Sequence, residues 1–81
     1  MEPFPNPAGT EINFWFVLPN SDDVKLILYD AKGSLIESVF SGTANKGLNQ
    51  FTLDITGLRK GVYVFRFVYL DEVHVRSFVK Y

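Results

Sequence analysis

The chain has 81 residues, of which 47% are hydrophobic and 16% aromatic, so we expect one folded domain with a modest core rather than a disordered segment. Its formal net charge of −1 argues against general attraction to nucleic acid or to anionic membranes. It contains no cysteine, which excludes disulfides, zinc–thiolate sites and thiol redox chemistry. The longest apolar run, residues 14–18, is far shorter than the ~20 residues of a membrane-spanning helix, so no membrane insertion is expected.

The first ten residues are rich in proline, glycine and asparagine. Prolines at three alternate positions remove backbone N–H donors and favour an extended, polyproline-like backbone, so residues 1–10 are predicted to form a proline-rich linker. Residues 11–18 follow as the first strand. The side chains of Ile12, Phe14, Phe16 and Leu18 share one face of that strand, and those of Asn13, Trp15 and Val17 share the other.

Turn signals divide the middle of the chain into three further strands. Residues 30–33 predict a type I turn with its glycine in the left-handed conformation, which would close a hairpin between residues 24–29 and 34–40. Residues 41–47 are polar with glycines near both ends and are predicted to be a loop. The fourth strand is expected over residues 48–55.

The last third of the chain contains the strongest strand pattern. Residues 56–61 predict a compact connection in which Leu58 closes one end of the core. Residues 62–69 follow with aromatic side chains on one face, and residues 73–81 return as the last strand. Six strands, with a possible seventh from the linker, predict an all-β fold, an immunoglobulin-like antiparallel β-sandwich of six to seven strands over residues 11–81.

No group of residues has the pattern of an active site. His74 has no neighbouring histidine or cysteine with which to bind a metal, no nucleophile motif accompanies it, and it is expected to face solvent. Asp22, Asp23 and Asp30 lie in turns and lack the order of a calcium loop. We therefore expect no cofactor and no enzymatic activity. Residues 57–81 hold five basic and two acidic side chains, which favours an acidic partner for this end of the chain.

Four short motifs stand in order along almost the whole chain. They are Phe4-Pro5-Asn6-Pro7; Val24, Leu26, Tyr29, Asp30 and Gly33; Gly57, Leu58, Gly61 and Tyr63; and Arg76, Phe78, Val79 and Lys80. In this order and spacing they resemble the C-terminal sorting domain of the type IX, or Por, secretion system of Bacteroidota. Phe4 and Arg76 stand where tyrosine and lysine are commoner in the family.

The resemblance implies a non-catalytic module at the C-terminus of a larger secreted cargo protein. Such a module would pass through the periplasm, be recognised by an outer-membrane translocon and be removed by a sortase-like peptidase, while the cargo reaches the cell surface or the medium. The recognition residues that the resemblance implies are Pro5, Asn6, Pro7, Gly57, Gly61, Tyr63, Arg76, Phe78, Val79 and Lys80.

The first two groups of candidate residues also have a purely structural interpretation. Residues 5–7 are either a recognised motif or a rigid turn in which Asn6 bonds nearby backbone. Gly57 and Gly61 either belong to a docking surface or supply unusual backbone angles, in which case Tyr63 packs in the core with its hydroxyl near the edge.

The terminal strand has two interpretations as well. Arg76 and Lys80 lie two pleats apart on one face, and with the carboxylate of Tyr81 they are expected to form an exposed end. A translocon could read this end by adding a strand, with charge for specificity. The alternative is that the charges only keep an edge strand from aggregating.

A different function also fits the sequence. Trp15 and the tyrosines could belong to a carbohydrate- or protein-binding accessory module of an extracellular multidomain enzyme, or the domain could be a structural spacer in such a protein. Either Trp15 or Phe16 is expected to be partly exposed, because the first strand has aromatic residues on both faces.

Overall fold

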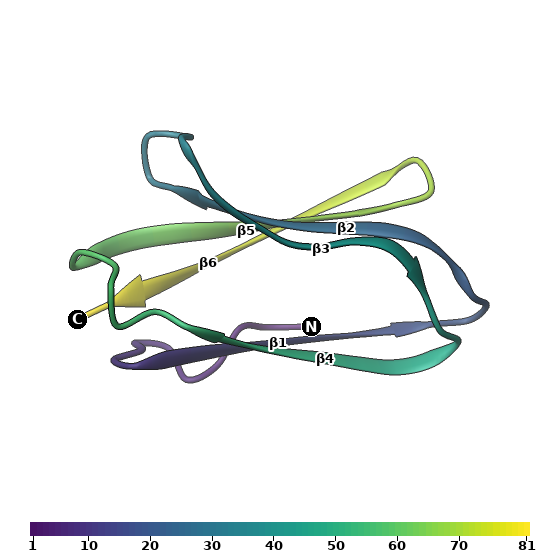
Figure 1. Ribbon diagram of the computed structural model, residues 1–81, viewed down its shortest axis with the longest axis horizontal. Coiled ribbons are helices and arrows are strands. Elements are labelled where there is room, and N and C mark those ends of the chain that lie inside the picture. Colours follow the sequence, from purple (N-terminus) through teal and green to yellow (C-terminus); the bar gives the residue numbers. More distant parts are fainter.

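A computed structural model describes residues 1–81 as two layers of antiparallel strands without a helix (Figure 1). The strands are β1 (Glu11–Leu18), β2 (Asp22–Asp30), β3 (Leu35–Ala44), β4 (Gly47–Asp54), β5 (Gly61–Tyr69) and β6 (Glu72–Lys80). One layer is a four-stranded sheet in the order β3-β2-β5-β6, and the other is the pair β1-β4. The prediction of an all-β sandwich is confirmed. No helix is long and apolar enough to cross a membrane.

The core lies between the two layers and is built by alternation along the strands. In β1 the four even-numbered side chains are at most 3% exposed, and the odd-numbered ones face outward. Phe14 packs between Phe65 and Phe67 of the facing sheet, with ring centroids 5.1 Å and 6.3 Å away. Offset and tilted ring pairs of this kind add to the stabilisation that burial alone provides. Leu58 packs against the core cluster, as predicted.

The β2–β3 hairpin closes on Asp30 as predicted. Its carboxylate accepts hydrogen bonds from the N–H groups of Lys32 and Ser34, both at 2.9 Å. Gly33 has φ 86°, the left-handed conformation that a side chain would disfavour.

The predicted loop over residues 41–47 is wrong. β3 continues to Ala44, because β2 begins two residues early and supplies partners for it. The Thr43 hydroxyl donates to Asp23 at 2.8 Å, and Ala44 is buried. Side-chain pairing across the strands therefore overrides the polar composition.

The first ten residues are neither a seventh strand nor an extended linker. They make only two isolated bridges, from Phe4 to Asn13 and from Ala8 to Lys80, with bends between them, and the Phe4–Pro5 and Asn6–Pro7 peptide bonds are cis. Figure 1 places the N-terminus between the two layers, beside β1. Pro3 and Ala8 are buried, so this segment covers part of the sandwich.

Candidate recognition site at the terminal strand

β6 forms one edge of the four-stranded sheet and pairs along its length with β5 alone, apart from the isolated bridge between Lys80 and Ala8. Its nine residues oppose nine residues of β5, from Gly61↔Lys80 to Tyr69↔Glu72, without a register shift. Alternation therefore sorts its side chains cleanly. Val73, Val75, Ser77 and Val79 face outward, and His74, Arg76, Phe78 and Lys80 face the other layer.

The expectation that Lys80 is exposed is wrong. Its side chain shares the inner face with Phe78, which is 1% exposed, and Lys80 itself is only 8% exposed. The Lys80 ammonium donates a hydrogen bond to the Tyr81 carbonyl at 3.1 Å. The long alkyl stem thus covers apolar surface while the charged end bonds to the last residue.

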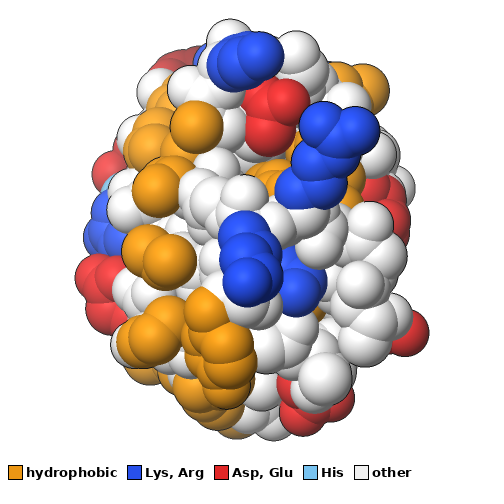
Figure 2. All heavy atoms as spheres, turned by 90° about the vertical axis from the view of Figure 1, so that its left-hand side faces the viewer, with side chains coloured by type: hydrophobic (Ala, Val, Ile, Leu, Met, Phe, Trp, Pro, Cys, Tyr) orange, Lys and Arg blue, Asp and Glu red, His pale blue; other side chains and the backbone are white.

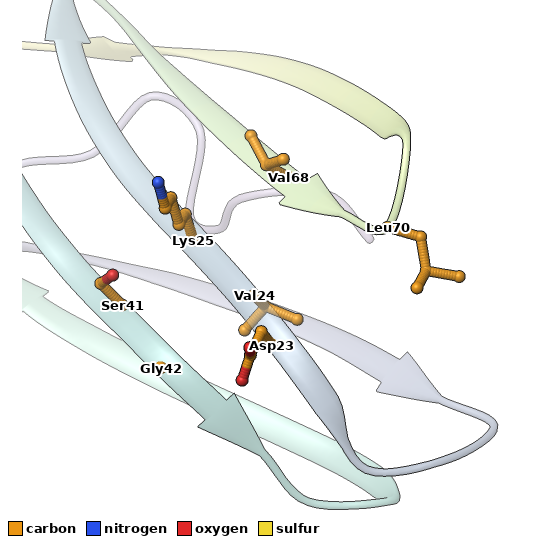
Figure 3. A pocket seen from close by; sticks show the side chains of 7 residues that line it. All are labelled: Asp23, Val24, Lys25, Ser41, Gly42, Val68 and Leu70. Atoms are coloured by element: carbon orange, nitrogen blue, oxygen red, sulfur yellow. The ribbon is translucent and has the colours of Figure 1, made fainter.

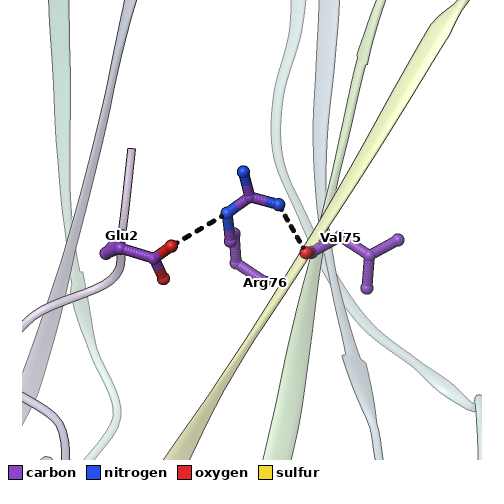
Figure 4. Close-up of polar contacts among 3 residues, drawn as sticks. All are labelled: Glu2, Val75 and Arg76. Atoms are coloured by element: carbon purple, nitrogen blue, oxygen red, sulfur yellow. Dashed lines mark hydrogen bonds and ion pairs between the residues drawn. The ribbon is translucent and has the colours of Figure 1, made fainter.

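Arg76 is half-buried on the same inner face and joins two parts of the chain. Its Nη1 donates to the backbone carbonyl of Val75 at 2.8 Å, and its Nε lies 3.2 Å from Oε1 of Glu2 (Figure 4). The second contact is an ion pair but not a hydrogen bond, and Nε has no hydrogen-bond partner. Glu2 is 76% exposed at its side chain, so water weakens this pair.

Asn6 and Ala8 bind the C-terminal end of the same strand. The Asn6 side-chain oxygen accepts from the Val79 N–H at 2.9 Å. The Ala8 N–H donates to the Val79 carbonyl at 2.8 Å, and the Tyr81 N–H donates to the Ala8 carbonyl at 3.0 Å. Asn6 therefore bonds the far end of the chain rather than nearby backbone, while Pro5 and Pro7 on either side are exposed.

The glycine–tyrosine motif lies partly at this site. Gly61 opposes Lys80 and Tyr63 opposes Phe78, with the two rings stacked at 5.7 Å. Tyr63 is buried and its hydroxyl donates to the Arg59 carbonyl at 2.7 Å, as its structural interpretation predicts. Gly61 has φ 154°, but Gly57 has no positive φ, so the expectation of an unusual backbone is confirmed for Gly61 and wrong for Gly57.

Three residues of the site escaped the sequence patterns. Glu2 pairs with Arg76, and Ala8 is fully buried. Gly9 lies under the Tyr81 ring, where a Cβ would come within 3.1 Å of the hydroxyl oxygen. The adjacent small residues Ala8 and Gly9 were the only available signal, since small side chains permit close approach of another chain segment.

A basic patch lies at the end of the sandwich that also carries the C-terminus (Figure 2). Lys32, Arg59 and Lys60 line an open hollow of about 250 Å³ there, together with Asp30. The Asp30 carboxylate is already bonded within its turn. The patch therefore presents a net positive charge next to the terminal strand.

A second hollow, of about 360 Å³, lies at the other end of the four-stranded sheet. Figure 3 shows Lys25, Ser41 and Val68 projecting over it from β2, β3 and β5. Ser41 and Lys25 oppose each other in this lining, but the Ser41 hydroxyl makes no hydrogen bond to Lys25 or to Asp23. No group of three histidine, aspartate or glutamate side chains is placed to hold a metal ion. His74 is half-buried with its ring 6.1 Å from that of Phe67, so the expectation that it faces solvent is wrong.

Trp15 lies away from the terminal strand, on the outer face of the β1-β4 pair. It is half-buried, whereas Phe16 is 1% exposed on the inner face. Val17 and Leu48, which oppose each other on that outer face, are 60% and 62% exposed. These residues form a small apolar surface that is separate from the site at β6.

Motif residues from both ends of the chain thus meet at β6. The model of the secretion system C-terminal sorting domain matches residues 2–81. The chain belongs to this family. It is therefore a type IX secretion sorting domain, a signal carried by secreted proteins destined for the cell surface or the extracellular space. No curated protein and no solved structure matches the chain significantly.

Proposed function

We propose that this sorting domain directs a larger cargo, which precedes it in the same polypeptide, from the periplasm across the outer membrane. The outer-membrane translocon recognises the domain, and a sortase-like peptidase then removes it. The domain itself is not an enzyme. The observation that carries the proposal is the family match over residues 2–81. The contact of Asn6 and Ala8 with Val79 and Tyr81 supports it, because it brings residues from the two ends of the chain together.

Export of a reporter tests the proposal. Residues 1–81 are fused to the C-terminus of a periplasmic reporter protein in a type IX-competent host, and the reporter is measured in the periplasm, on the surface and in the medium. We expect export that requires an intact translocon. A reporter that stays in the periplasm rejects the sorting role for this chain.

Deletion of residues 76–81 is a poor test, because it removes Phe78 from the core and would unfold the domain. Peptidase removal has its own readout. Mass spectrometry of the exported reporter should find its C-terminus upstream of β1 (Glu11–Leu18). An exported reporter that still carries residues 11–81 rejects the removal step and leaves the sorting role standing.

One observation favours a second function. Trp15, Val17 and Leu48 form an exposed apolar surface on the β1-β4 pair, which would suit a carbohydrate- or protein-binding accessory module. Binding on a glycan array that Trp15→Ala abolishes would support this function. A wild-type domain that binds no polysaccharide counts against the carbohydrate form of it.

A further inference from the structure

The free edge of β6 has backbone groups directed away from the sheet. The N–H and C=O of Val79 both bond to residues 6–8, which lie on the side opposite β5. Because backbone groups alternate along a strand, those of Ser77, Val75 and Val73 point to the same side. This edge therefore presents a row of donors and acceptors spaced for another strand.

Only part of that row is covered by the protein itself. Residues 6–8 cover Val79, and Arg76 Nη1 bonds the carbonyl of Val75. No side chain or loop bonds the outward groups of Ser77 or Val73. The bridge between Ala8 and Lys80 is parallel, so the C-terminal end of this edge already accepts an added chain segment.

The other sheet edges are less suited to strand addition. β3 has two register shifts against β2, and such irregularities make an edge less able to pair with another strand. The free edge of β1 is met by Phe4, which exchanges two hydrogen bonds with Asn13. β4 is regular, but three of its four outward side chains, Gln50, Thr52 and Asp54, are polar.

β6 combines a regular edge with an apolar outer face. Val73, Val75 and Val79 are 49%, 54% and 45% exposed, and they alternate with the inward Arg76. A strand added here would place side chains beside the valines on one face and beside His74 and Arg76 on the other. The position beside Arg76 calls for a carboxylate, because the only ion pair of Arg76 is with the exposed Glu2.

We infer that the β6 edge from Val73 to Ser77 binds an extended segment of a partner protein as an added strand. The segment carries an acidic side chain opposite Arg76, flanked by apolar side chains. Its carboxylate replaces that of Glu2, and its backbone N–H replaces Arg76 at the Val75 carbonyl. The excess of basic side chains in residues 57–81 favours such an acidic segment over a basic one. The inference rests on the proposed function in taking the translocon as the partner.

Two variants test the two parts of the inference. Ser77→Pro removes an outward N–H and leaves the β5 ladder intact, which is how proline is tolerated in an edge strand. Ser77→Ala keeps the N–H and is its control. We expect Ser77→Pro to weaken binding of the purified domain to detergent-solubilised translocon by about tenfold or more, and Ser77→Ala to bind as the wild type does.

A charge swap separates recognition from stability. Arg76→Glu breaks the pair with Glu2 and repels an acidic partner, whereas Glu2→Arg combined with Arg76→Glu restores an internal pair with reversed signs. We expect both to bind the translocon about tenfold or more weakly. If the double variant binds as the wild type does, Arg76 only stabilises the fold and the acidic partner is rejected.

The export assay distinguishes the possible failures. If the wild-type fusion is not exported, the proposed function fails. If it is exported and Ser77→Pro is exported and bound equally well, the edge inference alone fails. Sedimentation of the purified domain supplies a further check. A wild-type dimer that Ser77→Pro converts to a monomer would assign the edge to a second copy of this chain and overturn the inference.

Discussion

The side-chain oxygen of Asn6 accepts a hydrogen bond from the backbone N–H of Val79 at 2.9 Å, although 73 positions separate the two residues. The amide oxygen takes the place of the backbone carbonyl that a neighbouring strand would offer. The following residue, Pro7, has no N–H of its own. Asn6, in the motif near the start of the chain, thus caps β6 near the end of the chain.

The Asn6 cap predicts a measurable stability effect. Asn6→Ala should lower the free energy of unfolding by about 0.5–1.5 kcal/mol, because the Val79 N–H loses its partner in the protein. Urea unfolding measures the loss, and the Val79 amide should exchange its hydrogen faster. Asn6→Asp keeps an acceptor oxygen and should stay closer to the wild type. Equal stability of the alanine variant would show that water replaces the cap at no cost.

Gly57 in the β4–β5 connection and Gly61 at the start of β5 should respond differently to alanine. Gly61→Ala places a side chain at φ 154° and should cost about 1–3 kcal/mol. Gly57→Ala meets no atom within 4 Å and no positive φ, so it should be neutral or stabilise by about 0.4–1 kcal/mol. Denaturant unfolding of the two variants compares them directly. Equal losses would contradict the assignment of strain to Gly61 alone.

Residues on opposite faces of β1 should differ in their contribution to stability. Phe14→Ala removes a ring that is 1% exposed and should cost about 3–5 kcal/mol. That is a large share of the roughly 4–12 kcal/mol expected for a domain of this size. Val17→Ala, 60% exposed on the same strand, should change stability by less than about 0.5 kcal/mol. A comparable loss at Val17 would mean that the outer face is covered in solution.

Asp54 predicts a pH dependence. The Thr56 backbone N–H and hydroxyl donate to its carboxylate at 2.9 Å and 2.8 Å, and these bonds hold its pKa below the ordinary value. The carboxylate therefore stabilises the fold fully above the ordinary aspartate pKa of about 3.9, and this contribution is lost as the pH falls through the lower folded pKa.

An NMR titration of the Asp54 carboxyl carbon measures that midpoint. Thr56→Val removes the hydroxyl but keeps the backbone N–H, so the midpoint should rise part of the way to the ordinary value. Asp54→Asn should remove this share of the acid sensitivity. An unchanged midpoint in Thr56→Val would assign the whole effect to the backbone bond.

The sequence predicts those elements well whose structure depends on neighbouring residues in the chain, such as alternation within one strand. β1 has the predicted bounds, and the side chains that alternation assigned to the face of Phe14 and Phe16 are all buried. Asp30 and Gly33 specify their turn in the same local way. β3 extends beyond its prediction because Thr43 and Ala44 are ordered by β2, a contact that composition does not reveal.

The candidate site is harder to predict, because it depends on contacts between the two ends of the chain. Charge suggested an exposed Lys80, but the pairing of β6 with β5 turns its side chain toward the core. The family motifs included Asn6 and Val79 without indicating that they touch. If the face of β6 that carries Phe78 had been taken as the buried one, alternation would have placed the Lys80 side chain on the inner face as well.

The contact between residues 6–8 and β6 also has a mechanical consequence. The hydrogen bonds of Asn6 and Ala8 to Val79 and Tyr81 clasp the first segment of the chain to the last residues, beside the ion pair of Glu2 with Arg76. Tension applied between Met1 and Tyr81 therefore loads this clasp, the Glu2–Arg76 pair and the two Phe4–Asn13 hydrogen bonds before it reaches the Phe14 cluster. The clasp can open and release a few residues of slack while the aromatic interior stays folded.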